Sequence, residues 1–394
     1  MSFFVLPLEI RLYIYHLFFQ DHRNVVNFQQ PTNAHFALLH TCRAISVEAA
    51  HLRFYVSLTN DSQISRFVSN VSDEHASQQM QQITCIDVAN DARIVIPPSS
   101  NSAVPASDLY LALGKMTNLS QLRVFEGRRS RPANHFISGA RFSLQFEKAM
   151  FPFETVVPRL VSYELFLVPS TSPMHILFRV LPPTDVQTLR LSGGCVLYRG
   201  STFPSLRHLT ICGVTGHYLD QHMQDHLTAS QLRTFQYSQG DRLGFELTDH
   251  LLIPLAHSSA STLSKLVLLG CSKLSTTALT QCLQELSSLE YFAFSFITVH
   301  ELRSNFVTVL PPSLATLKLR VTNAFYARPL IEEENNLCDA LENLLHRLPP
   351  LTNIHLHLRH EVLQAHHRDE WWLKAALAAS CVLHLGPWEM DEII

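Results

Sequence analysis

Glycine and charged residues are both scarce in this chain of 394 residues. Only 12 residues are glycine, and Asp, Glu, Lys and Arg together make up 16%. Few glycines leave little material for loops whose backbone must approach a ligand closely. The motifs Gly-x-Gly-x-x-Gly, Gly-x-x-x-x-Gly-Lys-Ser/Thr and Gly-x-Ser-x-Gly are absent. Phosphate-binding loops and the hydrolase nucleophile elbow are therefore not predicted, and an enzyme is the least supported class of function.

Strong charge of either sign is also missing. The net charge is −3 with 22 histidines counted as neutral, so neither nucleic acid nor an anionic membrane is predicted as a main partner. No uncharged apolar run reaches membrane-spanning length. The apolar N-terminus lacks a basic region and is broken by Glu9 and Arg11, so it is not predicted to be a signal peptide. We expect a cytoplasmic and/or nuclear protein.

Metal-binding patterns are weak. The eight cysteines contain no Cys-x-x-Cys pair, and most lie within apolar runs, where cysteine behaves as a small buried hydrophobe. His355 and His357 share a predicted strand face and His360 is close in sequence, so three imidazoles are available for zinc. No acidic or cysteine ligand accompanies them at a regular spacing. We predict neither metal nor cofactor.

What is abundant is apolar sequence, at 46% of the chain, and its pattern is informative from the start. Pro7 suits the first turn of a helix, where its missing N–H is not needed. Glu9 then meets the positive end of the helix dipole. Ile10, Ile14 and Leu17 recur at helical spacing and share one face.

A second short helix is predicted around residues 38–45, with Leu38, Leu39, Cys42 and Ile45 on one face. Two helices this short cannot bury both apolar faces against each other, so some of this surface must contact the next domain or a partner. An ordinary helical hairpin packed on the body of the same chain is the alternative.

These two segments resemble an F-box, which opens with Leu-Pro-x-Glu-Ile and later carries Leu-x-x-Cys-Arg. One departure is the polar stretch from Gln20 to Phe36, which contains Pro31 where a middle helix usually lies. The resemblance implies that some apolar residues of the motif bind the adaptor and that others form the core of the F-box itself. The residues that match these apolar positions are Leu6, Pro7, Ile10, Ile14, Leu17, Leu39, Cys42 and Ile45.

The second half of the chain repeats the pattern Leu-x-x-Leu-x-Leu. Its central positions are 189, 209, 235, 266, 292, 317 and 354, at spacings of 20, 26, 31, 26, 25 and 37. Four of the six spacings fall within the period of about 20–29 residues that leucine-rich repeats show. The same spacing occurs upstream with centres at Ile86, Leu122 and Tyr163. Loops are predicted at 97–107 and 126–135 by composition.

Helices are predicted between these strands. Residues 275–286 have Ser275 or Thr276 as candidate N-cap. Thr298–Glu301 matches a capping box before the run 302–310. Residues 332–348 place three acids at the start of a helix. A helix from about Asp369 that carries Trp371 and Trp372 is predicted to cap the last repeat, and a short acidic tail follows at 389–394.

The stretch 263–274 resembles the cysteine-containing leucine-rich repeats, because Cys271 follows the last strand leucine by three residues. The predicted fold class is therefore α/β: an F-box-like helical domain (1–60), an irregular transition with early repeats (61–118), and a leucine-rich-repeat solenoid with a C-terminal cap (119–394). Parallel strands would line the concave face and helices the convex face. A non-repeating α/β domain with leucine-rich strands is the alternative.

Together the two resemblances are to fungal-type F-box proteins with leucine-rich repeats. That resemblance implies a substrate receptor of an SCF ubiquitin ligase, in which the F-box docks on a Skp-type adaptor, a cullin scaffold is bridged through it, and the repeats bind an unknown target protein. The alternative function is an interaction scaffold that is not linked to ubiquitination.

Strand alternation predicts which residues face outward on the concave side. Val267 and Leu269 form an apolar centre there, and Lys318 and Arg320 a basic end, which together suit an apolar anchor next to an acidic or phosphorylated stretch. Ordinary surface residues, or a face covered by the C-terminal segment, are the alternatives. The predicted target-binding residues are Arg190, Val267, Leu269, Lys318, Arg320, His355 and His357.

Overall fold

A computed structural model describes the fold. The described residues are 3–24, 31–69, 74–90, 108–126, 146–152, 156–167, 175–215, 223–239, 244–296, 305–321, 331–347, 351–364, 367–389 and 392. The chain forms two compact units. The first comprises Met1–Val168, Pro173–Pro183 and Ile394, and the second comprises Pro169–Ser172 and Thr184–Ile393. The predicted boundaries at residues 60 and 118 both fall inside the first unit.

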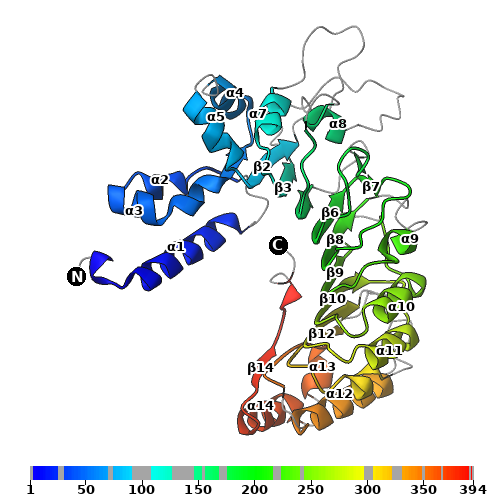
Figure 1. The fold of residues 1–394 in the computed structure, drawn as a ribbon. Coiled ribbons are helices and arrows are strands. Elements are labelled where there is room, and N and C mark those ends of the chain that lie inside the picture. The colour runs from blue at the N-terminus through cyan, green and yellow to red at the C-terminus, as the bar shows by residue number, and fades with distance from the viewer. Residues whose placement is uncertain are drawn as a thin grey trace, which may run out of the picture. The chain divides into compact units, whose positions relative to one another are not determined.

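The first unit is helical at its start and α/β afterwards (Figure 1). Its strands pair in parallel in the order β1-β2-β3-β4. Its elements are η1 (Phe3–Val5), α1 (Leu8–Arg23), α2 (Phe36–Leu39), α3 (Arg43–Glu48), η2 (Ala50–Phe54), β1 (Tyr55–Leu58), α4 (Asp61–Ser69), α5 (Glu74–Gln81), β2 (Cys85–Asn90), α7 (Leu109–Lys115), β3 (Gln121–Glu126), α8 (Phe146–Met150), β4 (Ser162–Phe166) and β5 (His175–Leu177).

The second unit alternates strands with helices. Its strands β6 and β8 to β14 pair in parallel in that order. Its elements are β6 (Thr188–Gly193), β7 (Cys195–Leu197), β8 (His208–Val214), α9 (Met223–Leu227), β9 (Thr234–Ser238), α10 (Asp249–Ser258), β10 (Lys265–Cys271), α11 (Thr276–Glu285), β11 (Tyr291–Phe296), η4 (Phe306–Val309), β12 (Thr316–Val321), α12 (Ile331–Leu345), β13 (Asn353–His357), α13 (His360–Gln364), α14 (Arg368–Ala378) and β14 (Val382–Leu385).

The strand register of the second unit follows the leucine pattern. Each central position pairs with the next, so the sequence alignment is also the alignment in space. The ladder runs through Leu189, Leu209, Phe235, Leu266, Phe292, Leu317, Ile354 and Leu383. In the first unit Ile86 pairs with Leu122, and Leu122 with Tyr163. The predicted α/β class with parallel strands is thus confirmed.

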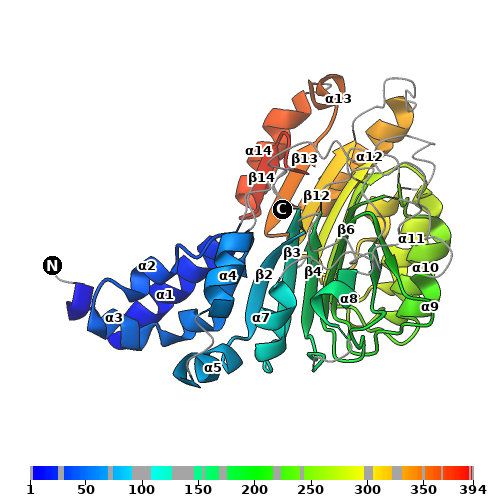
Figure 2. The same ribbon diagram turned by 90° about the horizontal axis from the view of Figure 1, so that it is seen from above.

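Burial explains why the register holds. A one-residue slip would turn every apolar side chain of a strand to the opposite face, so the leucine row fixes the pairing. Helices α9, α10 and α11 lie along one side of these strands (Figure 2), and the central residues of the pattern from Leu189 to Ile354 are buried. We call the opposite side of β6 and β8–β13 the strand face. It carries the seven residues that the sequence predicts to bind a target.

A glycine recurs at one place in three strands. Gly193, Gly213 and Gly270 each stand two residues after the last leucine position of the pattern, with φ of 64°, 59° and 69°. A side chain at these positions would be strained, since the left-handed region favours glycine. The pairing register shifts beside Gly193 and Gly270. The few glycines of the chain are therefore used partly to end its strands.

Most predicted helices are present. Helix α11 begins after Ser275, whose hydroxyl accepts a hydrogen bond from the Ala278 amide at 3.0 Å, and α12 starts with three acids. Helix α14 carries Trp371 and Trp372 as expected. Phe306–Val309, in the run predicted after the capping box, is a 3₁₀ helix. Thr298–Glu301, and the predicted loops at 97–107 and 126–135 apart from Glu126, lie outside the described residues.

Strands β1 and β14 of the parallel ladders, and the short strands β5 and β7, are not predicted by the sequence pattern. Strand β14 continues the ladder after α14, but Ser380 stands where the first leucine of the pattern would be. Strand β1 pairs Val56 with Ile86, and Arg53 occupies the corresponding first position. Both strands therefore lack the signal that marks the others. Within the described residues, no helix has the length and apolar character needed to cross a membrane.

Candidate protein-binding surfaces

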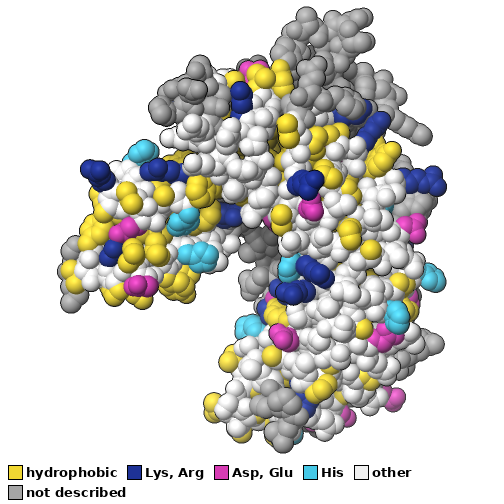
Figure 3. Space-filling model, viewed as in Figure 1, with side chains coloured by type: hydrophobic (Ala, Val, Ile, Leu, Met, Phe, Trp, Pro, Cys, Tyr) yellow, Lys and Arg dark blue, Asp and Glu magenta, His cyan; other side chains and the backbone are white. Residues whose placement is uncertain are grey.

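Helix α1 leaves an apolar face open. Ile10 is 47% exposed and Leu17 is 44% exposed, although both are large and apolar. Figure 3 shows hydrophobic side chains gathered over α1 in the first unit. The remaining exposed hydrophobic residues of this segment are Phe4, Val5, Leu6, Leu8, Leu12, Tyr13, Ile14 and Phe18. Exposure of this many large apolar side chains on one short segment is typical of interaction surfaces.

The opposite side of α1 is held by an ion pair. Arg11 binds Glu48 of α3 in a bidentate manner, with N–O distances of 3.0 and 2.6 Å. The Tyr15 hydroxyl donates to the same carboxylate at 3.0 Å. Hydrogen bonding from Arg11 lowers the pKa of Glu48 below its ordinary value. Tyr15 is buried in a cluster with Leu39, and this pairing fixes which face of α1 points inward.

The C-terminal end of α1 is tied to the sheet of its unit. Arg123 on β3 forms a buried ion pair with Asp87 on β2, at 2.7 Å for both nitrogens. The third contact of Arg123 runs from its Nη1 to the backbone carbonyl of Arg23, at 2.7 Å. Burial alone would lower the pKa of Arg123, but the hydrogen bonds and charge of Asp87 outweigh it and raise that pKa. The helix is therefore anchored at both ends.

Histidine packing adds to this anchor. His35 is buried, with its Nδ1 3.2 Å from Nε2 of His22 and its Nε2 3.2 Å from the Tyr55 carbonyl. Burial, and then the neighbouring His22, lower the pKa of His35 to about 4. The polar link that weakens the F-box pattern thus contains a side chain that belongs to the core of the unit.

The structure sorts the eight predicted F-box residues. Leu39 lies in the internal cluster, and Ile45 packs against that cluster from a half-buried position. The other six are exposed, namely Leu6, Pro7, Ile10, Ile14, Leu17 and Cys42. Most of the predicted set therefore faces outward.

The strand face corrects one expectation. Val267 and Leu269 are 0% and 7% exposed, so they are not an open anchor patch. Trp388, itself 2% exposed, packs on them and on Ala293, and Tyr291 borders this cluster. The physical reason is that side chains which gain nothing by facing water are covered by an aromatic residue from the same unit. The sequence alternative in which the C-terminal segment covers this face agrees with the structure.

The basic end of the strand face is neutralised by the same segment. Lys318 is paired with Glu392, which also accepts a hydrogen bond from the Tyr291 hydroxyl. Arg320 Nε lies 2.8 Å from Oε1 of Glu389, and His357 Nδ1 lies 3.6 Å from that oxygen. Burial and then the bond to Glu392 raise the pKa of Tyr291. Lys318 and Arg320 are thus engaged, where the sequence suggested that they face outward to a target.

The remaining two predicted residues of this face are Arg190 and His355. Arg190 is half-buried and pairs across the ladder with Thr210. His355 is half-buried, and its ring lies 5.3 Å from that of His384 on the neighbouring strand. Among the described residues, no group of three His, Cys, Asp or Glu side chains is placed to hold a metal ion.

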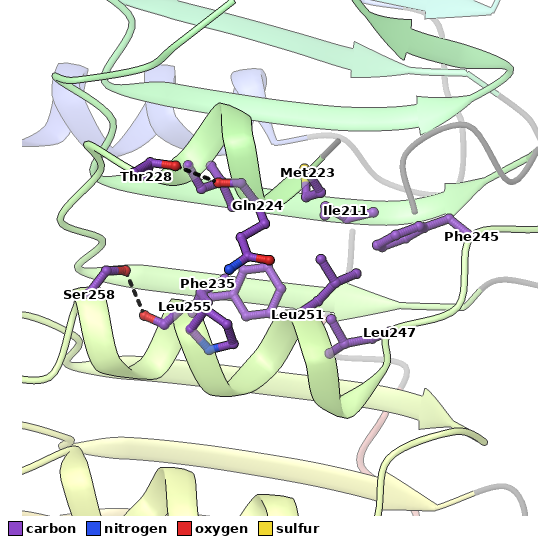
Figure 4. Close-up of a pocket in the computed structure, with 12 residues that line it drawn as sticks. Ile211, Met223, Gln224, Thr228, Phe235, Phe245, Leu247, Leu251, Leu255 and Ser258 are labelled. Carbon is purple, nitrogen blue, oxygen red and sulfur yellow. Dashed lines mark hydrogen bonds between the residues drawn. The ribbon is translucent and has the colours of Figure 1, made fainter. Parts of the chain in front are cut away.

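An apolar cavity of about 150 Å³ lies between α9 and α10 (Figure 4). Ile211 and Phe235 form its floor, and Phe245 and Leu251 are among its walls. Its hydroxyl groups are turned to the backbone: Thr228 donates to the Gln224 carbonyl at 2.9 Å and Ser258 to the Leu255 carbonyl at 3.0 Å. The described residues that line the cavity include no titratable group.

Comparison with known proteins gives no family. A scan against models of protein families finds no match, and a search of curated proteins finds no similar sequence.

Sequence reasoning did not assign Trp388, Glu389 and Glu392 to the strand face. The sequence indicates a short acidic tail at 389–394 and offers cover by the C-terminal segment as one alternative, without naming these residues. Its charge is complementary to Lys318 and Arg320, and that complementarity was the one signal available.

Proposed function

We propose that this protein is a non-enzymatic substrate-recognition adaptor of an SCF-type ubiquitin ligase. Helices α1 to α3 form an F-box-like module that docks on a Skp-type adaptor, which bridges to a cullin scaffold. The strands of the second unit form a leucine-rich-repeat solenoid that binds the target protein. This places one partner surface on each unit.

The observation that carries the proposal is the open apolar face of α1. Ile10, Ile14 and Leu17 are exposed on a helix whose other side is fixed by Arg11 and Tyr15. Exposed apolar side chains on a rigid element bind a partner without a large ordering cost. The resemblance of the Leu-Pro-x-Glu-Ile opening to an F-box suggests the partner, because these exposed residues match apolar positions of that motif.

Two features support the solenoid. The repeated central residues are paired in register along the second unit, and glycines with positive φ recur two residues after the pattern in β6, β8 and β10. A stack of equivalent strand–helix units is the architecture of a solenoid, in which each unit packs on its neighbours.

The test is capture of the full-length chain by a purified Skp-type adaptor. Wild type should bind, and Ile10→Asp with Ile14→Asp should weaken binding by about 100-fold or more, since two charges replace the centre of an apolar contact. Both positions are exposed, so the variant should keep the wild-type circular dichroism spectrum and melting temperature.

Leu377→Asp is the matched control, because Leu377 is an exposed leucine on helix α14 of the second unit. It should bind the adaptor as the wild type does. Failure of the wild-type chain to bind would reject the adaptor function and favour an interaction scaffold not linked to ubiquitination. The absence of a helix in residues 31–35, within the link where a middle helix usually lies, is the observation that favours this second candidate.

A further inference from the structure

The segment 386–392, described at residues 386–389 and 392, is bound to the strand face mainly through side chains. Trp388 covers Val267, Leu269 and Ala293, and its indole N–H donates to the Leu319 carbonyl at 3.2 Å. An aromatic side chain buried on an apolar patch, with its polar edge satisfied, is a common anchor at protein interfaces.

Two acids of the segment complete the contact. Glu389 is next to Trp388 and meets Arg320 and His357, while Glu392 meets Lys318 and the Tyr291 hydroxyl. Charge-assisted bonds of this kind are stronger than neutral ones and depend on position. An aromatic residue followed by carboxylates one and four positions later therefore matches the face in both shape and charge.

This contact differs from the pairing that builds the sheet. Strand β14 pairs with β13 as far as Leu385, and the Gly386 N–H donates one further hydrogen bond to the Leu356 carbonyl at 2.9 Å. Trp388, Glu389 and Glu392 then contact β10, β11, β12 and β13 across the strands rather than along one of them. Recognition across several strands by spaced side chains is how a ligand binds a sheet face, whereas an added strand binds an edge.

We propose that the strand face is a peptide-binding site and that segment 386–392 is its in-chain ligand. The partner is a peptide segment of the same chemistry: an aromatic residue, a carboxylate at the next position and a second carboxylate three positions further on. Such a segment displaces Trp388 when it binds. The inference rests on the proposed function in one respect, because it names the chemistry of the target that the adaptor would recognise.

The covalent link gives the in-chain segment an advantage. A tethered ligand competes at a high effective concentration, so a free peptide binds only to the fraction of molecules whose segment is released. The segment would thereby exclude peptides that lack either the aromatic anchor or the two acids. Selection by displacement needs no change in the fold of the second unit.

The experiment uses fluorescence anisotropy with two labelled probes and full-length protein. One probe is the peptide of residues 386–394, and the other keeps only the aromatic residue and the two acids at these spacings in a Gly/Ser background. The receptor variants are the wild type and a released variant, Trp388→Ala with Glu389→Ala and Glu392→Ala. The released variant should bind both probes about tenfold or more tightly than the wild type.

Matched controls separate this contact from non-specific binding. A probe with Lys in place of both acids should not bind the released variant. Adding Lys318→Glu with Arg320→Glu to that variant should create binding of the Lys probe and abolish binding of the acidic probes. A milder receptor, Glu389→Gln with Glu392→Gln, keeps Trp388 and should fall between the wild type and the released variant.

Equal affinity of wild type and released variant would overturn the proposal, and so would a folded released variant that binds neither acidic probe. A released variant that fails to fold would show that the segment is an integral part of the unit, which also overturns it. Capture by the Skp-type adaptor is measured on the same proteins. Loss of peptide binding with retained capture rejects only this inference, and the reverse result rejects only the adaptor function.

Discussion

On helix α1, Ile10 and Leu17 keep nearly half of their surface in solvent, whereas Val267 and Leu269 on strand β10 keep almost none. Both sets are apolar. Neither lies on the side of its helix or strand that the repeated apolar pattern or the Tyr15 cluster buries. The strand face is covered by Trp388 with two flanking acids, while the α1 face carries no such cover among the described residues. An exposed-looking apolar pattern in sequence therefore has two outcomes, and the availability of a complementary segment in the same unit separates them.

The largest effect is expected at the Arg123–Asp87 ion pair, in the unit that carries the open face of α1. Arg123→Met should lower the free energy of unfolding of the first unit by about 3–5 kcal/mol, because Asp87 is left as a buried charge without its partner. It also removes the bond from Arg123 to the Arg23 carbonyl at the end of α1. Hydrogen exchange of β2 and β3 in increasing urea measures the change.

The matching double variant sharpens that result. Asp87→Leu with Arg123→Met should recover most of the lost stability, since no unpaired charge remains. If Arg123→Met leaves the exchange of β2 and β3 unchanged, the Arg123–Asp87 ion pair does not stabilise the first unit as described. Exchange of β10 and β11 in the second unit serves as the internal reference.

The comparison itself is tested by one substitution on each face. Leu269→Ala should destabilise the second unit by about 2 kcal/mol, the lower part of the range for buried leucines, because the covering residue can partly close the gap. Leu17→Ala on the open face should change the stability of the first unit by less than about 0.5 kcal/mol. The urea midpoint of each unit, followed by hydrogen exchange, gives the change in free energy of unfolding for each variant.

Equal costs at Leu269 and Leu17 would contradict the distinction between a covered and an open face. A large cost at Leu17 would mean that α1 is packed on its own unit in solution. A negligible cost at Leu269 would mean that Trp388 is released from the strand face for most of the time.

A change of pH perturbs the first unit without any substitution. Burial lowers the pKa of both His35 and His175, each to about 4, while an unfolded histidine titrates near 6.5. The unfolded chain therefore binds more protons between these values, so this contribution to stability is complete above about pH 6.5 and is lost as the pH falls towards 4. Both histidines belong to the first unit.

The urea midpoint of the first unit should accordingly be lower at pH 5 than at pH 7. Hydrogen exchange measures both midpoints, with the exchange rates referred to one common pH. His35→Asn, which removes one of the histidines whose pKa is lowered by burial, should make that fall smaller. An unchanged midpoint in the wild type would show that His35 and His175 are protonated in the folded unit or reach solvent.

Repetition determined how much of this fold was predictable. The strands around Leu189, Leu266 and Leu317 were found because each carries three apolar residues at the same spacing, and burial then forces them into one register. Strand β14 was not predictable, because Ser380 interrupts the three-residue apolar pattern. Its pairing with β13 determines the strand instead. Helix α11 was predictable for a local reason, since its N-cap Ser275 acts within one turn of the chain.

The sequence by itself determined the parallel α/β class, the strand register and the apolar face of α1, because each depends on periodicity along the chain. Only the tertiary structure decided which apolar residues stay in water. Val267 and Trp388 are 121 positions apart, and nothing local to either residue indicates the other. Their contact arises because the strand–helix stack brings the end of β14 back to the strand face, where hydrophobic burial and opposite charges favour the same arrangement.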